Sequence, residues 1–142
     1  MNEHQTSHII VGIDPGKHTG YAEYDARTKR LRECEALLIH QAMRRIENLQ
    51  NLQLLKMVVF EDARLRTWLG SKGREALQGA GSIKRDCTIW EDFLRDIGVV
   101  YRNIKPAAGA TKWPAAKFAK MTGWKHRTNE HARDAAVLVW GA

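Results

Sequence analysis

The sequence predicts an α/β domain in which a mixed sheet of five strands is flanked by helices. Short apolar runs bounded by turn residues come first, and later runs alternate with longer segments whose apolar residues follow a helical spacing. The 142 residues suffice for one hydrophobic core and are too few for two domains of ordinary size. We therefore expect residues 1–142 to form a single domain.

Three strands are expected at the start of the chain. Residues 8–14 form a short apolar run that ends in Asp-Pro-Gly, as a buried strand stopped by a turn does. Residues 19–25 and 31–38 are separated by a polar stretch, and the three runs together predict an antiparallel meander. A helical spacing over residues 40–52 and a β-rich run over residues 56–61 then predict a crossover to a parallel strand.

The next part of the chain should contain one long helical segment and a last strand. Residues 71–97 have a helical composition, although Gly79 and Gly81 interrupt it and argue against one straight helix. Residues 99–103 form the last apolar run.

Two helices should end the chain, which gives the order β-β-β-α-β-α-β-α-α. Proline is tolerated only in a first helical turn, so the helix containing Pro114 should begin near Trp113 and stop at Gly123. A final helix capped by Thr128 or Asn129 should run to about residue 140.

The chain carries a formal net charge of +7, and all of the excess lies after Glu61. Residues 1–61 hold eight basic and eight acidic side chains, whereas residues 62–142 hold fifteen basic and eight acidic ones. Trp68, Trp90, Trp113 and Trp124 are interleaved with these basic residues. Such a pattern is typical of a polyanion-binding face, and a generally solvated basic surface is the plain alternative.

Cysteine usage and hydropathy exclude several classes of protein. Cys34 and Cys87 are far apart and form no Cys-x-x-Cys pair, so neither a zinc site nor a disulfide framework is indicated. No stretch approaches the roughly 18 to 20 apolar residues of a membrane span. We therefore expect a cytoplasmic protein with no membrane partner.

Acidic residues stand at positions that the predicted sheet should bring together. Asp14 and Glu61 end strands that should be parallel neighbours, so both should project from the same edge, where ligands tend to bind. Asp134 lies in the last helix, where His131 at i−3 or Glu130 at i−4 could share its face, and the helix alone does not decide between them. Crowded carboxylates repel one another, and a divalent cation would remove that cost.

An oxygen-rich site of this kind suits Mg²⁺ or Mn²⁺. Two such ions about 3.5–4 Å apart can activate a water and stabilise the leaving oxygen in phosphodiester hydrolysis. We therefore expect two ions per site and hydrolysis of a phosphodiester as the chemistry.

Three segments resemble the motifs of RuvC-type Holliday-junction resolvases, which belong to the ribonuclease-H-like superfamily. Residues 11–22 (VGIDPGKHTGYA) resemble the first motif, residues 60–62 (FED) the second and residues 131–138 (HARDAAVL) the terminal one. The first and last motifs are fairly specific, and the second is poor in information. The likeness spans residues 8–140 and implies a ribonuclease-H-like fold.

Carried over position by position, the resemblance also implies a catalytic set. The metal-binding catalytic residues would be Asp14, Glu61, His131 and Asp134, with His131 where many members have Asp. Lys112 matches a catalytic basic position that contacts the scissile region, and Lys105 lies near a second DNA-contacting position. A cation there could stabilise charge building on the phosphate, while ordinary surface lysines are the alternative reading.

The chain departs from the family after the second motif. Relatives carry an aromatic residue three positions after the Glu, used as a wedge at the junction centre, and Arg64 stands there instead. Trp68 could stack on an unpaired base, which is worth roughly 1–3 kcal/mol, but if it is a core residue the wedge is lost. The DNA-binding residues expected in this region are Arg64, Arg66, Trp68, Lys72 and Arg74.

The resemblance implies a homodimer acting on branched DNA, with a four-way junction as the leading substrate. A symmetric substrate favours a two-fold dimer with one active site on each of two opposed strands. Residues 79–81 (GAG) would let a partner backbone approach, with Ala76, Leu77, Ile83 and Ile89 supplying apolar area. The alternative is that this face packs on the protein's own sheet.

Four functions follow from these observations. The leading one is a structure-selective endonuclease that resolves Holliday junctions or related branches. A ribonuclease-H-like nuclease or transposase-type core of other specificity, such as a flap nuclease, is the main alternative. A catalytically silent nucleic-acid-binding module would not need the complete acidic set, and an ATP-binding domain of the actin and sugar-kinase type would need a second domain and over twice this length.

Overall fold

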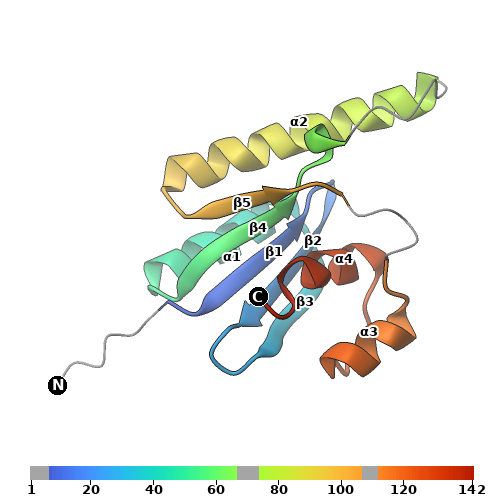
Figure 1. Ribbon diagram of the computed structural model, residues 1–142. Helices are drawn as coiled ribbons and strands as arrows, with labels where there is room; N and C mark the ends of the chain where they lie inside the picture. Colours follow the sequence, from blue (N-terminus) through green and yellow to red (C-terminus); the bar gives the residue numbers. More distant parts are fainter. Residues whose placement is uncertain (1–6, 67–73, 107–111) are drawn as a thin grey trace.

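The computed structural model describes residues 7–66, 74–106 and 112–142, with the backbone alone for residues 74–80. It contains a five-stranded sheet in the order β3-β2-β1-β4-β5. The first three strands form an antiparallel meander; β4 then pairs in parallel with β1, and β5 pairs in parallel with β4 (Figure 1). The strands are β1 (Ile9–Asp14), β2 (His18–Asp25), β3 (Arg30–Leu38), β4 (Leu55–Glu61) and β5 (Tyr101–Ile104).

Helices cover both faces of the sheet, so the predicted α/β fold with a mixed, helix-flanked sheet is confirmed. One face packs against α1 (Ile39–Asn51) and α2 (Arg74–Ile97). The other packs against α3 (Ala115–Thr122) and α4 (Glu130–Val139). No helix in the described ranges is long and apolar enough to cross a membrane.

The alternation of side chains along β1 explains the two cores. Ile9, Val11 and Ile13 point toward α1 and α2, where Trp90 is fully buried. Ile10 points the other way, into the cluster formed with the small residues of α4. All six residues of β1 are buried, as expected for a strand covered on both faces.

Several element ends differ from the sequence predictions. Helix α2 continues through Gly79 and Gly81, since a glycine inside a helix costs only about 1 kcal/mol relative to alanine and does not by itself end the helix. Helix α3 begins after Pro114, whose extended backbone (φ −63°, ψ 160°) places it at the cap rather than inside the first turn. A short 3-10 helix, η1 (Ala63–Leu65), follows β4 and was not predicted.

The cap of α4 is Asn129 rather than Thr128. Its Oδ1 accepts a hydrogen bond from the backbone N–H of Ala132 at 2.8 Å. Such a side-chain cap satisfies one of the amide groups that the first helical turn leaves unpaired. The start of α4 is thereby well defined, which matters because two candidate site residues follow directly.

Candidate active site

Two acidic residues lie side by side at one edge of the sheet. β1 and β4 are parallel, with Ile13 paired to Phe60, so Asp14 and Glu61 are the next residues of each strand. Asp14 is 9% exposed, and Glu61 is half-buried. The carboxyl ends of these parallel strands therefore bring two carboxylates together, as predicted from the sequence.

Two glycines allow α4 to lie directly on β1 and β2. A methyl group on Gly12 would overlap the backbone oxygen of Ala135, and one on Gly20 would overlap the backbone oxygen of His131. Such close packing of backbone on backbone requires the absence of a side chain. Sequence reasoning missed this role, although a glycine in the interior of each of two predicted strands was a usable signal.

The first turn of α4 brings His131 to Asp14. Nδ1 of His131 lies 3.0 Å from Oδ2 of Asp14, across 117 residues of sequence. The adjacent Glu130 instead contacts Lys112, whose Nζ lies 3.1 Å from its Oε1. Of the two neighbours that could share a face with Asp134, His131 is therefore the one that joins Asp14.

Lys112 lies between two acidic residues of α4. Its Nζ donates hydrogen bonds to Oε1 of Glu130 and to Oδ2 of Asp134, both at 3.1 Å. Burial lowers the pKa of Lys112, but hydrogen bonds and attraction from the two carboxylates outweigh it and raise the pKa overall. Lys112 thus places a permanent positive charge at the edge where the carboxylates meet.

The electrostatics show that the three carboxylates share one environment. The pKa of Glu61 rises to about 7, first through burial and then through repulsion by Asp14 and Asp134. Burial also raises the pKa of Asp14, with repulsion from Asp134 adding to it, although the hydrogen bond to His131 acts in the opposite direction. A bound cation would offset the repulsion between these carboxylates and favour their charged forms.

The chemistry of these donors fits a hard divalent cation, which prefers carboxylate oxygens. Glu61 supports the fit most directly, because its carboxylate has no hydrogen bond or ion pair with a described residue although burial disfavours its charge. Within residues 7–66, 74–106 and 112–142, no three Asp, Glu, His or Cys side chains lie close enough together to enclose an ion. Binding an ion would therefore require these side chains to move closer to one another.

A second network beside Glu61 anchors the end of β4. Asp62 is fully buried, and its carboxylate accepts hydrogen bonds from Arg64 Nε at 2.8 Å and Asn103 Nδ2 at 3.1 Å. Burial raises the pKa of Asp62, but these bonds outweigh it and hold the pKa at about 2. Arg64 also binds Glu91 of α2 at 3.1 Å, so the network ties η1, β5 and α2 together.

The predicted DNA-binding residues fall into three groups. Arg66 and Lys105 are exposed near the ends of β4 and β5, close to the carboxylate edge. Arg64, by contrast, is engaged by Asp62 and Glu91. Trp68 and Lys72 lie outside the described residues, as does the side chain of Arg74, the first residue of α2.

The predicted dimer face lies on α2. Ile83 and Ile89 are each 43% exposed, and nothing lies within 4 Å of a methyl group built on Gly81. The side chains of Ala76, Leu77 and Ala80 lie outside the described part of the chain.

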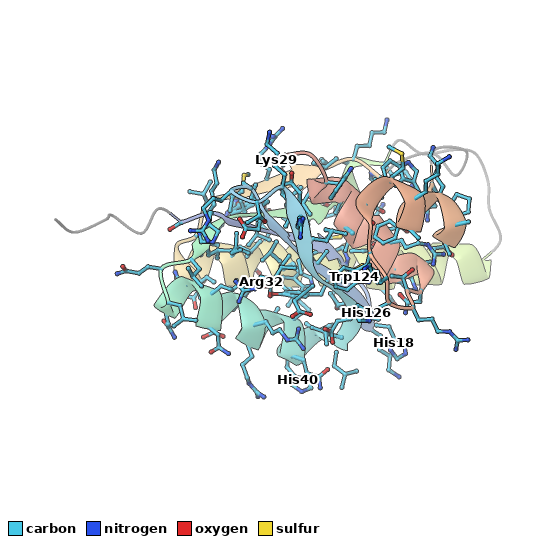
Figure 2. All side chains as sticks on the ribbon, turned by 90° about the horizontal axis from the view of Figure 1, so that it is seen from below. His18, Lys29, Arg32, His40, Trp124 and His126 are labelled. Carbon is cyan, nitrogen blue, oxygen red and sulfur yellow. The ribbon has the colours of Figure 1, made fainter. Side chains whose placement is uncertain are left out.

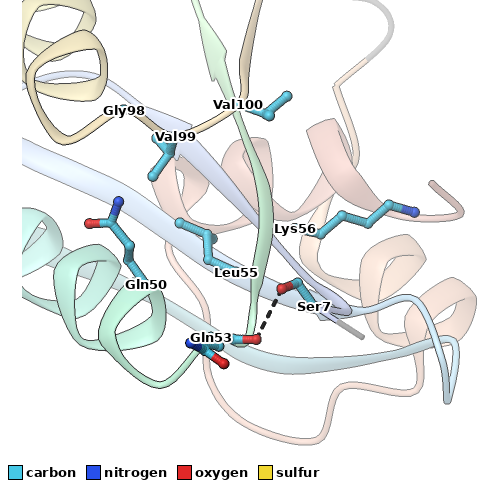
Figure 3. A pocket seen from close by; sticks show the side chains of 8 residues that line it. All are labelled: Ser7, Gln50, Gln53, Leu55, Lys56, Gly98, Val99 and Val100. Atoms are coloured by element: carbon cyan, nitrogen blue, oxygen red, sulfur yellow. Dashed lines mark hydrogen bonds between the residues drawn. The ribbon is translucent and has the colours of Figure 1, made fainter. Parts of the chain in front are cut away.

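A shallow pocket of about 400 Å³ lies at the opposite end of the sheet (Figure 3). It is lined by residues at the end of α1, at the start of β4 and just before β1 and β5, and Ser7 donates a hydrogen bond to the backbone oxygen of Gln53 at 2.9 Å within it. Lys56 is its one charged lining residue. It therefore has no carboxylate or imidazole for the chemistry of the carboxylate edge.

Comparisons with known proteins bear on the fold. No family model matches the sequence, and no curated protein matches it. Seven chains of solved structures match, among them RuvC of Thermus thermophilus, with 17% sequence identity and a TM-score of 0.53. That match covers 93% of this chain and 91% of the Thermus chain. The chain therefore has a RuvC-like, ribonuclease-H-like fold.

Proposed function

We propose that the protein is a metal-dependent endonuclease that cleaves branched DNA, with the four-way junction as its preferred substrate. The observation that carries the proposal is the placement of Asp14 and Glu61 at the ends of parallel neighbouring strands, with Asp134 of α4 near enough to raise the pKa of both. His131 joins them through its contact with Asp14. The structural likeness to RuvC supports the choice of a junction as substrate.

Asp14, Glu61, Asp134 and His131 would hold Mg²⁺ or Mn²⁺, with two ions expected. Bound there, such ions supply an activated water and neutralise charge in phosphodiester hydrolysis. Asp14 orients the ring of His131 by binding Nδ1, which leaves Nε2 directed away from it. Lys112 holds a positive charge beside Asp134, where it can stabilise negative charge that builds on a phosphate.

Exposed basic residues around the edge would contact the DNA backbone. Arg66 and Lys105 are the described candidates, and Trp68, Lys72 and Arg74 remain predictions from the sequence. The proposed role of Arg64 is weakened by its two carboxylate partners, which leave its guanidinium little capacity for a phosphate. Arg64 is better suited to holding η1 in place beside Glu61.

We also propose that the protein acts as a homodimer through α2. The exposed Ile83 and Ile89 offer apolar area for a second copy, and a symmetric junction suits a symmetric dimer. Arg64 at the position of the family's aromatic wedge favours one alternative, a ribonuclease-H-like nuclease that prefers flaps or other branches.

The proposal is tested with Asp14→Asn on matched four-way, three-way, flap and linear DNAs, with Mg²⁺ or Mn²⁺. The variant should lose cleavage and keep or tighten junction binding, because it removes a proposed metal ligand and one negative charge near phosphates. Asp96→Asn is the matched control, since Asp96 is exposed on α2 and forms no ion pair with a described residue.

The outcomes separate the candidate functions. Paired symmetric nicks confined to the four-way DNA would support the junction-resolving enzyme. Cleavage of flaps in preference to junctions would favour the nuclease of other specificity. If Asp14→Asn cuts at the wild-type rate, the catalytic assignment is wrong, and if the wild type binds DNA without cutting any substrate, the protein is a binding module.

A further inference from the structure

The positive charge of the chain is concentrated in one segment. Residues 97–129 contain seven Lys and Arg and no Asp or Glu. Because the whole chain has a net charge of +7, all residues outside this segment balance to zero. The net attraction of the protein for a polyanion therefore comes from β5, α3 and the loops around them.

Four of these cations lie on α3 and in the loop that leads to α4. Each is exposed, and none forms an ion pair with a residue in the described ranges. Lys112, in contrast, is engaged by Glu130 and Asp134. We call the four residues the α3 surface: Lys117, Lys120, Lys125 and Arg127.

Helix α3 contributes little to the core. Phe118 is the one buried residue among its eight, and the helix projects beside α4 away from α2 (Figure 1). A helix so exposed gains little stability from burial, so its cationic side chains are not explained by packing.

Two tryptophans flank the α3 surface, but their rings are occupied. Nζ of Lys117 lies 5.2 Å from the ring centroid of Trp113, and Trp124 packs edge-on against His126 with centroids 5.2 Å apart. Figure 2 shows Trp124 and His126 together beside α3 and α4. Both tryptophans also pack against the core under α4, so neither offers a free face for stacking a base. The α3 surface is therefore suited to phosphates rather than to unpaired bases.

We infer that the α3 surface docks the phosphate backbone of duplex DNA, an arm of the substrate that leads away from the active site. Lys112, which binds Asp134, stands three residues before the start of α3, so the chain leads from the carboxylate edge directly into this helix. This inference rests on the proposed function in taking DNA as the substrate.

The occupied rings of Trp113 and Trp124, rather than charge density, favour a duplex over a single strand. An eight-residue helix is about 12 Å long. Along that length a duplex presents about seven phosphate charges, twice the number on a single strand at the same rise. Four cations on and beside α3 could be neutralised by either form, whereas a single strand would also need a free ring on which its bases could stack.

The test compares a triple variant, Lys117→Gln with Lys120→Gln and Lys125→Gln, with a control of equal charge change. The control is Arg30→Gln with Arg44→Gln and Lys56→Gln, three exposed positions outside the segment. Binding of an unbranched duplex oligonucleotide is measured by fluorescence anisotropy in EDTA over a salt series, so that no cleavage step is required. Thermal melts of both variants confirm that the fold is retained.

Removing three phosphate contacts should lower the slope of log affinity against log salt by about 2.7, and the affinity by the order of 10²-fold at about 0.1 M salt. The control should keep the wild-type slope. Equal losses in the two variants, or none in the triple variant, would overturn the inference. A loss seen with single-stranded DNA or RNA but not with duplex DNA would also overturn it. Cleavage by the wild type is scored separately with Mg²⁺, and its failure would count against the proposed function while leaving duplex docking intact.

Discussion

Replacing Gly20 by alanine should displace the first turn of α4 and disable the site without replacing a functional side chain. The new methyl group would overlap the backbone oxygen of His131 and lie 3.0 Å from Cβ of Asp14. A backbone oxygen in a helix cannot swing aside as a flexible side chain can, so either β2 or α4 must move. The contact between His131 and Asp14, at 3.0 Å, lies where α4 meets the sheet, so a shift of either element would disturb it.

The magnitude follows from the cost of overpacking a close-packed interior, which is typically about 1–3 kcal/mol. Because the neighbour at Gly20 is backbone, we expect the upper part of that range, about 2–3 kcal/mol. For a chain of this size each kcal/mol lowers Tm by roughly 3–4 °C, so a loss of about 6–12 °C is expected. DNA cleavage should fall together with stability, even at temperatures where the variant is folded.

Thermal unfolding by circular dichroism and a cleavage assay well below Tm measure the two effects separately. Gly81→Ala is the matched control for the unfolding measurement, since nothing lies within 4 Å of a methyl group there. Inside a helix that change should stabilise the protein by about 0.5–1 kcal/mol. If Gly20→Ala is as stable and as active as the wild type, α4 does not depend on this glycine and the reasoning is refuted.

Two further predictions concern the charges at the sheet edge. Glu61 has a folded pKa of about 7, above the ordinary 4.5, so ionising it destabilises the protein as pH rises from about 4.5 through 7. Glu61→Gln should therefore stabilise the protein by about 1–2 kcal/mol at pH 8 in EDTA, after discount for partial solvent screening, and by nothing at pH 4. Calorimetry across pH measures this; no gain at pH 8, or an equal gain at both pH values, would contradict it. Arg64→Ala should cost about 3 kcal/mol in urea unfolding, because it leaves the buried carboxylate of Asp62 without its guanidinium. Arg44→Ala, at an exposed position, should cost under 1 kcal/mol, and equal effects of the two changes would show that Arg64 is not structural.

The order of the elements could be predicted from the sequence because their signals are local. Period-2 and helical spacings, the Asp-Pro-Gly turn and the position of Pro114 depend on neighbours a few residues away. The same local reasoning placed Asp14 and Glu61 at strand ends, and a parallel pairing then put them on one edge of the sheet. Local signals misjudged α2, where Gly79 and Gly81 stay helical, and gave no sign of η1.

The sequence by itself determined the fold class, the positive second half and the acidic residues that could share a site. Only the tertiary structure decided which side chains contact one another: His131 with Asp14, Lys112 with Asp134, and Arg64 with Asp62. The contacts of a side chain depend on all the residues that folding brings near it, including residues far away in the sequence. The contact between His131 and Asp14, for example, spans 117 residues. The close packing of α4 on Gly12 and Gly20 also became visible only in the tertiary structure. It depends on which backbone segment lies against each glycine after folding.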